Sequence, residues 1–213
     1  MTNECPRIIG SVPVYTAMTP MPLMYFLSLS QETGRADAQG RYKLRWIVGG
    51  PKTQTHIIRN AACAVVLQSG ATHLLLIDDD MCPTADIIDN LLLLDLPIVS
   101  PIFFRDNGDP LVFDWDPVTP KRVSMTNYPV DQVFEAPAGV GTGVMLIKRQ
   151  VIEAIDGPCF GVGEYSDLDF CAKAAAVGFK SYCDSRILVR QMGKPEPIGS
   201  SQWERRRQCD EKK

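Results

Sequence analysis

The order of short apolar segments along the chain predicts an α/β fold with a mostly parallel sheet flanked by helices. Strand-like and helix-like segments alternate from residue 7 to residue 100, which is the pattern of strands joined by crossover helices. The apolar run Leu74–Ile77 continues directly into three aspartates, Asp78, Asp79 and Asp80. Ligands of parallel sheets bind beyond the carboxyl ends of the strands. We therefore expect the aspartates to mark the functional edge of the sheet.

Apolar periodicity and turn residues set the predicted elements of the first half. Helical spacing over 55–69 is followed by Gly70 as a stop, and Thr84 is the predicted N-cap of the next helix. The polar run 31–40 predicts a loop. The predicted order is strand 7–14, helix 22–30, strand 42–48, helix 55–69, strand 74–77, helix 85–94 and strand 97–100.

The second half begins with a long stretch, 103–137, in which prolines and isolated aromatic residues alternate. It predicts an irregular insertion with a hairpin around 111–115, either the wall of an acceptor pocket or an ordinary long insertion. Residues 1–193 are predicted to form one domain, and 194–213 a mobile basic tail. The remaining predicted elements are a glycine-rich turn at 138–143, strand 144–147, helix 150–155, helix 168–177 and strand 180–184.

Composition limits the class of protein. The 213 residues are 45% hydrophobic with a net charge of −3, which gives the chain as a whole no general attraction to nucleic acid or anionic membrane. From residue 186 to residue 213, eight Lys or Arg stand against four Asp or Glu. The seven scattered cysteines include no C-x-x-C pair, which predicts reduced core thiols. We expect a cytoplasmic protein without a signal peptide or a transmembrane segment.

The three aspartates favour a cation site. Asp78 and Asp80 are two positions apart and project from the same side of an extended chain. Hard ions such as Mg²⁺ and Mn²⁺ take oxygen ligands, often one or two carboxylates and the phosphates of a substrate. The alternative is a solvated acidic turn after a core strand.

A second acidic cluster, Glu164, Asp167 and Asp169, precedes or opens the helix predicted at 168–177. Acidic residues are common at helix starts because the N-terminal dipole favours negative charge, so helix capping alone explains each of them. Their position downstream of the glycine-rich strand start also fits an acidic catalytic group. Both interpretations stay open on the residues alone.

Taken in order, these segments resemble the GT-A glycosyltransferases, in particular short family-2-like members of phage and bacterial genomes. The resemblance runs from the first strand to about Gly193 and is carried by four segments. These are Arg59-Asn60, the strand Ala71-Thr-His-Leu-Leu-Leu-Ile-Asp-Asp-Asp80 with its Asp-x-Asp motif, Val140-Gly-Thr-Gly-Val-Met-Leu-Ile147, and Ser166-Asp-Leu-Asp-Phe-Cys171. It implies a Rossmann-like GT-A domain.

The resemblance also implies a reaction: transfer of a sugar from a UDP- or GDP-sugar to an acceptor hydroxyl, dependent on Mn²⁺ or Mg²⁺, with inversion. Asp80 would bind the metal, Asp78 would share the ion or contact the ribose, and Asp167 would be the general base, with Glu164 beside it. The other implied contacts to the nucleotide sugar are Pro13, Tyr15, Arg59, Asn60, Asp79, Gly141, Thr142 and Gly143.

Two positions depart from the family pattern. Ser166 stands where the family usually has Glu, and Gln191-Met-Gly193 stands where it often has a His-x-Gly that adds a metal ligand. A neutral amide oxygen, such as that of Gln191, can bind Mg²⁺ or Ca²⁺ but is a poorer ligand than imidazole for softer ions.

Two other functions remain open: a nucleotidyltransferase, and a degenerate scaffold that binds nucleotide sugars or glycans without turnover. A nucleotidyltransferase usually opens with a glycine-rich basic loop, whereas 11–19 contains no Gly, Lys or Arg. The acceptor is equally open among a glycan, a lipid-linked saccharide, a protein and a modified nucleic-acid base. A phage-encoded chain would act in the host cytoplasm.

Overall fold

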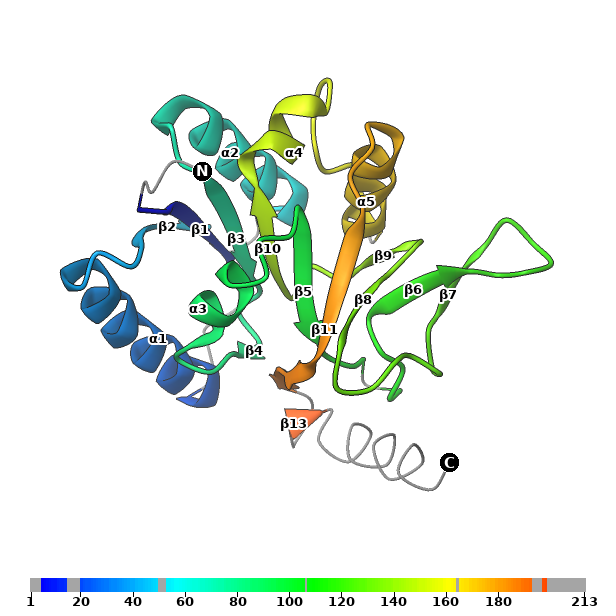
Figure 1. The fold of residues 1–213 in the computed structure, drawn as a ribbon, viewed down its shortest axis with the longest axis horizontal. Coiled ribbons are helices and arrows are strands. Elements are labelled where there is room, and N and C mark those ends of the chain that lie inside the picture. Colours follow the sequence, from blue (N-terminus) through cyan, green and yellow to red (C-terminus); the bar gives the residue numbers. More distant parts are fainter. Residues whose placement is uncertain are drawn as a thin grey trace.

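The computed structural model describes residues 5–14, 20–49, 53–105, 107–163, 165–192 and 197–198. Within these residues the chain forms a central sheet with helices on both faces (Figure 1). The predicted α/β class is confirmed. The basic tail, 194–213, falls almost wholly outside the described residues, so its predicted mobility and the domain boundary stay predictions.

The central sheet has seven strands in the order β2-β1-β3-β10-β5-β11-β8. Strands β1, β2, β3, β5 and β11 run parallel to one another, whereas β8 and β10 are antiparallel. The mostly parallel sheet predicted from the sequence is therefore confirmed. The strands are β1 (Arg7–Pro13), β2 (Lys43–Gly49), β3 (His73–Ile77), β5 (Ile98–Ile102), β8 (Val133–Glu135), β10 (Val144–Lys148) and β11 (Ser181–Leu188).

Helices cover the two faces of the sheet in separate layers (Figure 1). They are α1 (Pro20–Ala38), α2 (Thr55–Ser69), α3 (Ile87–Leu92), α4 (Arg149–Ala154) and α5 (Ser166–Ala176). Successive residues of β3 point to opposite faces, so Leu74 and Leu76 join the core under α2, α4 and α5, while Leu75 and Ile77 join the core under α1 and α3. The strand is buried on both sides, as its unbroken apolar run predicted.

Two small sheets complete the fold. In the first, β12 (Arg190–Met192) lies between β13 (Pro197–Ile198) and β4 (Met81–Cys82). Strand β12 pairs in antiparallel fashion with β4, which directly follows the aspartates. In the second, β6 (Val112–Trp115) lies between β7 (Arg122–Ser124) and β9 (Gly139–Val140). Strands β6 and β7 form the predicted hairpin, which projects from the body beside α5 (Figure 1).

Three predictions of local structure were wrong. Residues 31–38 continue helix α1 and are not a loop, because Ala36 is fully buried in the core beside Leu29. Thr84 does not cap α3 with its side chain; its main-chain carbonyl accepts the N–H of Ile87 at 3.2 Å. Residues 103–137 are less irregular than predicted, since 133–135 adds the edge strand β8.

The described cysteines carry free thiols, as the sequence predicted. All of them except Cys5 are buried. In the part of the chain that the structure describes, no helix combines the length and the apolar character that a membrane crossing requires.

Candidate functional site

The three aspartates lie in a turn, not on an extended strand. β3 ends at Ile77, the N–H of Asp78 donates to the carbonyl of Gly143 at 2.9 Å, and the N–H of Met81 donates back to the carbonyl of Asp78 at 3.1 Å. The expectation that Asp78 and Asp80 project from one side of an extended chain is therefore wrong. In the turn, each of these two carboxylates has a protein partner of its own.

Asp78 pairs with Arg59, which α2 places beneath the turn. The Arg59 side chain is buried, with 5% of the residue exposed, and its Nη2 donates to Asp78 Oδ1 at 2.8 Å. Its Nη1 donates to Ser166 Oγ at 3.3 Å, and the guanidinium lies over the ring of Phe160 at 5.9 Å. Ser166 is the first residue of α5. One arginine thus joins the end of β3 to the start of the helix that carries the second acidic cluster.

Asp167 follows Ser166 in the first turn of α5. Burial raises the pKa of its carboxyl and the charge of Asp78 adds to the rise, while the N–H of Leu168 and the charge of Arg59 oppose it. The N–H of Leu168 donates to Asp167 Oδ1 at 2.8 Å. A carboxylate that is partly desolvated and still ionisable has the properties of a general base. Glu164, the other predicted catalytic residue, lies outside the described residues.

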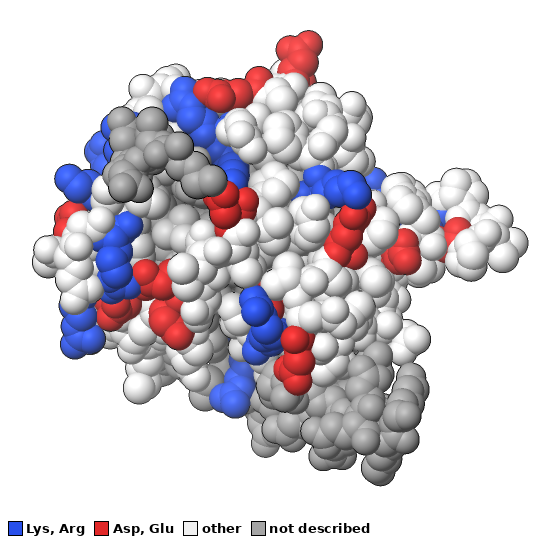
Figure 2. All heavy atoms as spheres, viewed as in Figure 1, with Lys and Arg blue, Asp and Glu red and all other residues white. Residues whose placement is uncertain are grey.

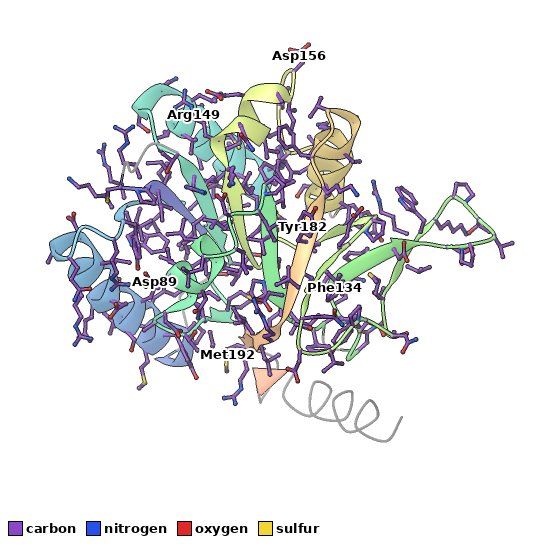
Figure 3. The ribbon with its side chains drawn as sticks, in the orientation of Figure 1. Asp89, Phe134, Arg149, Asp156, Tyr182 and Met192 are labelled. Atoms are coloured by element: carbon purple, nitrogen blue, oxygen red, sulfur yellow. The ribbon has the colours of Figure 1, made fainter. Side chains whose placement is uncertain are left out.

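Asp80 lies beside Gln191, the other metal ligand that the resemblance implied. The pairing of β12 with β4 places Gln191 opposite Met81, and Gln191 Nε2 donates to Asp80 Oδ2 at 2.8 Å. Met192, labelled in Figure 3 below the main sheet, donates its N–H to the carbonyl of Asp80 at 2.8 Å. Burial, together with the charges of Asp78 and Asp79, raises the pKa of the Asp80 carboxyl to about 6, and the hydrogen bond from Gln191 opposes this rise.

The donor atoms of Asp80 and Gln191 fit a hard cation. Gln191 Oε1 is buried without a hydrogen-bond partner among the described residues, and a rotation of the amide would turn this oxygen toward Asp80. A carboxylate oxygen and an amide oxygen are ligands that Mg²⁺ and Mn²⁺ accept. Within the described residues, His, Cys, Asp and Glu form no group of three or more that could hold a metal ion. Substrate oxygens would have to complete the coordination.

Asn60 supports the site through the main chain. Its Nδ2 donates to the carbonyl of Phe160 at 2.8 Å, and its Oδ1 accepts the N–H of Phe160 at 2.9 Å. Both ends of the amide are thus engaged, and the ring of Phe160 is held against Arg59. The predicted contact of Asn60 with a nucleotide would require this clamp to open.

The structure describes the remaining predicted residues except Tyr15. Pro13 is buried at the end of β1, and Thr142 is buried in the glycine-rich segment. Gly143 packs so closely that a Cβ there would lie 2.7 Å from the ring of Phe103. Gly141 donates its N–H to the carbonyl of Leu111 at 2.8 Å. The other two predicted contacts are Asp79, which is half-buried, and Tyr15, which lies outside the described residues.

Sequence reasoning missed two members of the site. Ser166 counted only as a departure from a family pattern, whereas its hydroxyl accepts a hydrogen bond from Arg59. Phe160 was not singled out, although it contacts both Arg59 and Asn60. The one signal in the sequence was the position of Phe160 as the single aromatic residue in the glycine-rich segment 157–163. The residues that Phe160 contacts lie about one hundred positions earlier, on α2.

Comparisons with known proteins bear on the fold. No protein-family model and no curated protein matches the chain. Among solved structures, A197 from STIV is 17% identical. The match covers 87% of this chain and 85% of the A197 chain, with a TM-score of 0.58. S. aureus TarS 1–349 in complex with UDP-GlcNAc is 11% identical. This match covers 86% of the present chain and 57% of the TarS chain, with a TM-score of 0.53. The chain has a GT-A-like fold.

A UDP-glucose pyrophosphorylase matches nearly the whole chain as well. An apo UDP-glucose pyrophosphorylase is 8% identical, and the match covers 98% of both chains with a TM-score of 0.53. At these identities the likeness concerns the fold alone.

Proposed function

We propose that this protein is a family-2-like, metal-dependent glycosyltransferase that moves a sugar from a UDP- or GDP-sugar to an acceptor hydroxyl with inversion. The observation that carries the proposal is the buried Arg59, which binds Asp78 at the end of β3 and Ser166 at the start of α5. This contact places the Asp-x-Asp turn beside Asp167. Carboxylates that hold a cation for the diphosphate and a separate base for the acceptor are the two parts that the proposed reaction requires.

The donor side of the proposed site is the turn at 78–80. Asp80 and Gln191 would hold Mn²⁺ or Mg²⁺, and the ion would neutralise the negative charge that develops on the departing nucleoside diphosphate. Asp78 is fixed by Arg59, so its second carboxylate oxygen is the atom available to the ion or to the ribose. Pro13, at the end of the neighbouring strand β1, would border the base.

The acceptor side begins at Asp167. In the proposed step, the Asp167 carboxylate takes the proton of the acceptor hydroxyl while that oxygen bonds to the anomeric carbon. The bond from the anomeric carbon to the diphosphate breaks on the opposite side, and the diphosphate leaves with the bonding electrons. The raised pKa of Asp167 makes this carboxylate a stronger base than an exposed one.

The second candidate is nucleotidyl transfer, in which a sugar phosphate attacks a nucleoside triphosphate and pyrophosphate leaves. The likeness to a UDP-glucose pyrophosphorylase over nearly the whole chain supports it. The sequence between residues 11 and 19 counts against it, because it lacks the glycine and basic residues that usually bind the triphosphate. A scaffold that binds nucleotide sugars without turnover is the third candidate.

One set of assays separates the three candidates. The purified chain is incubated with UDP-, GDP- and TDP-sugars in Mn²⁺, Mg²⁺ or EDTA, and release of nucleoside diphosphate is followed. A parallel reaction with nucleoside triphosphates and sugar 1-phosphates is followed by pyrophosphate release. Metal-dependent release of the diphosphate supports glycosyl transfer, and pyrophosphate release supports nucleotidyl transfer. Donor binding in calorimetry with neither product supports the binding scaffold.

Two variants test the assigned roles against a matched control. Asp80→Ala should abolish metal-dependent release of the diphosphate, and full turnover by it would remove the metal role. Asp167→Asn should retain donor affinity and lose turnover, so loss of donor binding would contradict a base that acts only on the acceptor. Asp156→Asn is the control, since Asp156 is exposed and lies at the opposite end of the molecule from Met192 in Figure 3.

A further inference from the structure

A pocket of about 590 Å³ lies between the β6–β7 hairpin and the start of α5. Its size is within the usual range of small-molecule sites. Tyr165 and Leu168, which flank Asp167, line one side of it, so the pocket adjoins the acceptor side of the proposed site. The charged and aromatic lining residues are Arg105, Phe113, Trp115, Lys121, Arg122 and Tyr165.

Two aromatic rings are open to solvent at this pocket. Trp115 is 48% exposed and Tyr165 is 64% exposed, although large aromatic side chains usually bury most of their surface. They come from different elements, the end of β6 and the residue before α5. Figure 1 shows the hairpin projecting past α5, and Figure 2 shows it as a lobe that stands out from the body. A flat ligand can therefore reach both rings from solvent.

Three cations around the pocket form no ion pair with a described carboxylate. In the described part of the chain, no carboxylate forms an ion pair with Arg105, Lys121 or Arg122, and the two arginines lie instead over the rings of Phe113 and Trp115, each at 5.4 Å. Five other cations of the fold do face carboxylates, in the pairs Arg41–Asp89, Arg59–Asp78, Arg149–Glu153, Lys173–Asp169 and Arg186–Asp184.

The acidic side chains of the hairpin accept hydrogen bonds from its own main chain. Asp114 Oδ1 accepts the N–H of Trp115 at 2.7 Å. Asp116 Oδ1 accepts the N–H groups of Val118 and Thr119 at 2.9 and 2.7 Å. These bonds shape the turn, and in the described residues neither carboxylate forms an ion pair with the lysine or the arginines. The positive charge of the pocket is therefore available to a ligand.

Exposed rings interleaved with free cations are the features that bind single-stranded nucleic acid. Bases stack on aromatic side chains in a sequence-tolerant way, and Lys and Arg follow the phosphates. The rest of the described lining is Pro120, Ser124 and Leu168, so the neutral polar groups of the pocket are the hydroxyls of Ser124 and Tyr165 and the indole N–H of Trp115. A neutral sugar polymer could stack on the exposed rings as well, but it offers no negative charge to the three cations. A phosphate-linked chain of planar bases matches both the charge and the rings.

We propose that this pocket binds a single-stranded nucleic-acid segment on the acceptor side of the site, with bases on Trp115 and Tyr165 and phosphates on Arg105, Lys121 and Arg122. The proposal rests on the proposed glycosyltransferase function for its link to Asp167. The binding itself does not depend on that function. Three phosphate contacts on a single strand give a slope of log affinity against log salt of about −2, so affinity should fall about 20-fold between 50 and 200 mM salt.

The test is fluorescence anisotropy of the full chain with a labelled single-stranded oligothymidylate about ten nucleotides long, a length within the range that one binding fold covers. Lys121→Gln should weaken binding about 3- to 10-fold and make the salt slope shallower by about 0.7, the share of one phosphate contact. Trp115→Leu should weaken it about 5-fold or more through loss of stacking. The control is Lys43→Gln, which removes an exposed lysine of β2 outside this pocket and should bind as wild type does.

Each variant is checked for an unchanged urea midpoint and for affinity toward the nucleotide sugar. Wild-type affinity for the oligonucleotide in Lys121→Gln and Trp115→Leu would overturn the proposal. The proposal would also be overturned if the wild-type chain bound a polyol-phosphate polymer more tightly than the oligonucleotide. Oligonucleotide binding in a chain that binds no nucleotide sugar would contradict the proposed glycosyl transfer and support the assignment of the pocket. Donor turnover without oligonucleotide binding would contradict only the assignment of the pocket.

Discussion

Replacing Arg59 by methionine should weaken the fold and separate the two acidic clusters. Methionine keeps much of the aliphatic volume of arginine and its contact with Phe160, but it removes the hydrogen bonds to Asp78 at 2.8 Å and to Ser166 at 3.3 Å. The substitution therefore tests the polar contacts more than the packing. The side chain of Arg59 is almost fully buried, so water cannot replace both contacts.

The magnitude follows from the two contacts. A hydrogen bond to a charged group contributes about 1.5–3 kcal/mol, and breaking a fully buried ion pair by removing one partner costs about 3–5 kcal/mol. The Asp78 side chain is 26% exposed, so solvent compensates part of its loss. Removing the guanidinium also relieves the burial of its unpartnered Nε. We expect the free energy of unfolding to fall by about 2 kcal/mol.

Urea unfolding at neutral pH measures the change, and a double-mutant cycle with Asp78→Asn isolates the pair. The coupling between Arg59 and Asp78 should be about 1–2 kcal/mol. Arg35→Met is the control: Arg35 forms an exposed pair with Glu32 three residues earlier, and its loss should change stability by less than about 0.5 kcal/mol. An Arg59→Met protein as stable as wild type, with zero coupling to Asp78, would refute the bridge as a stabilising contact.

Three further predictions concern neighbouring groups. Asn60→Ala removes both hydrogen bonds to Phe160, so urea unfolding should show a loss of about 1–3 kcal/mol, and no loss would contradict the clamp. In EDTA, the Asp80 carboxyl has a folded pKa of about 6 against an ordinary 3.8, so it favours the folded state below pH 4 and loses that contribution as pH rises through 6. Asp80→Asn should match wild type near pH 4 and exceed its stability by at most about 3 kcal/mol at pH 8; a constant difference would contradict the shift. Gly143→Ala places a methyl group against the buried ring of Phe103 and should cost about 1–3 kcal/mol by thermal or urea unfolding, whereas a neutral effect would mean that the ring moves aside freely.

The sequence by itself determined most of the sheet and of its helices, and the strand β3 that ends at the aspartates. Local periodicity sufficed for α2, whose bounds Thr55–Ser69 match the prediction, and for β3, because an apolar run buried on both faces has few other solutions. It failed where the core overrode local polarity, as in the second half of α1, and where an edge strand depends on a partner far along the chain, as for β8.

Only the tertiary structure decided what the candidate residues contact. The sequence presented Asp78 and Asp80 as a pair, yet a turn directs Asp78 to Arg59 on α2 and Asp80 to Gln191 on β12. These partners are separated from the aspartates by 19 and 111 residues, so no local pattern encodes the contacts. Residue spacing fixes which groups share a strand end, whereas the packing of helices against the sheet fixes which groups meet across it.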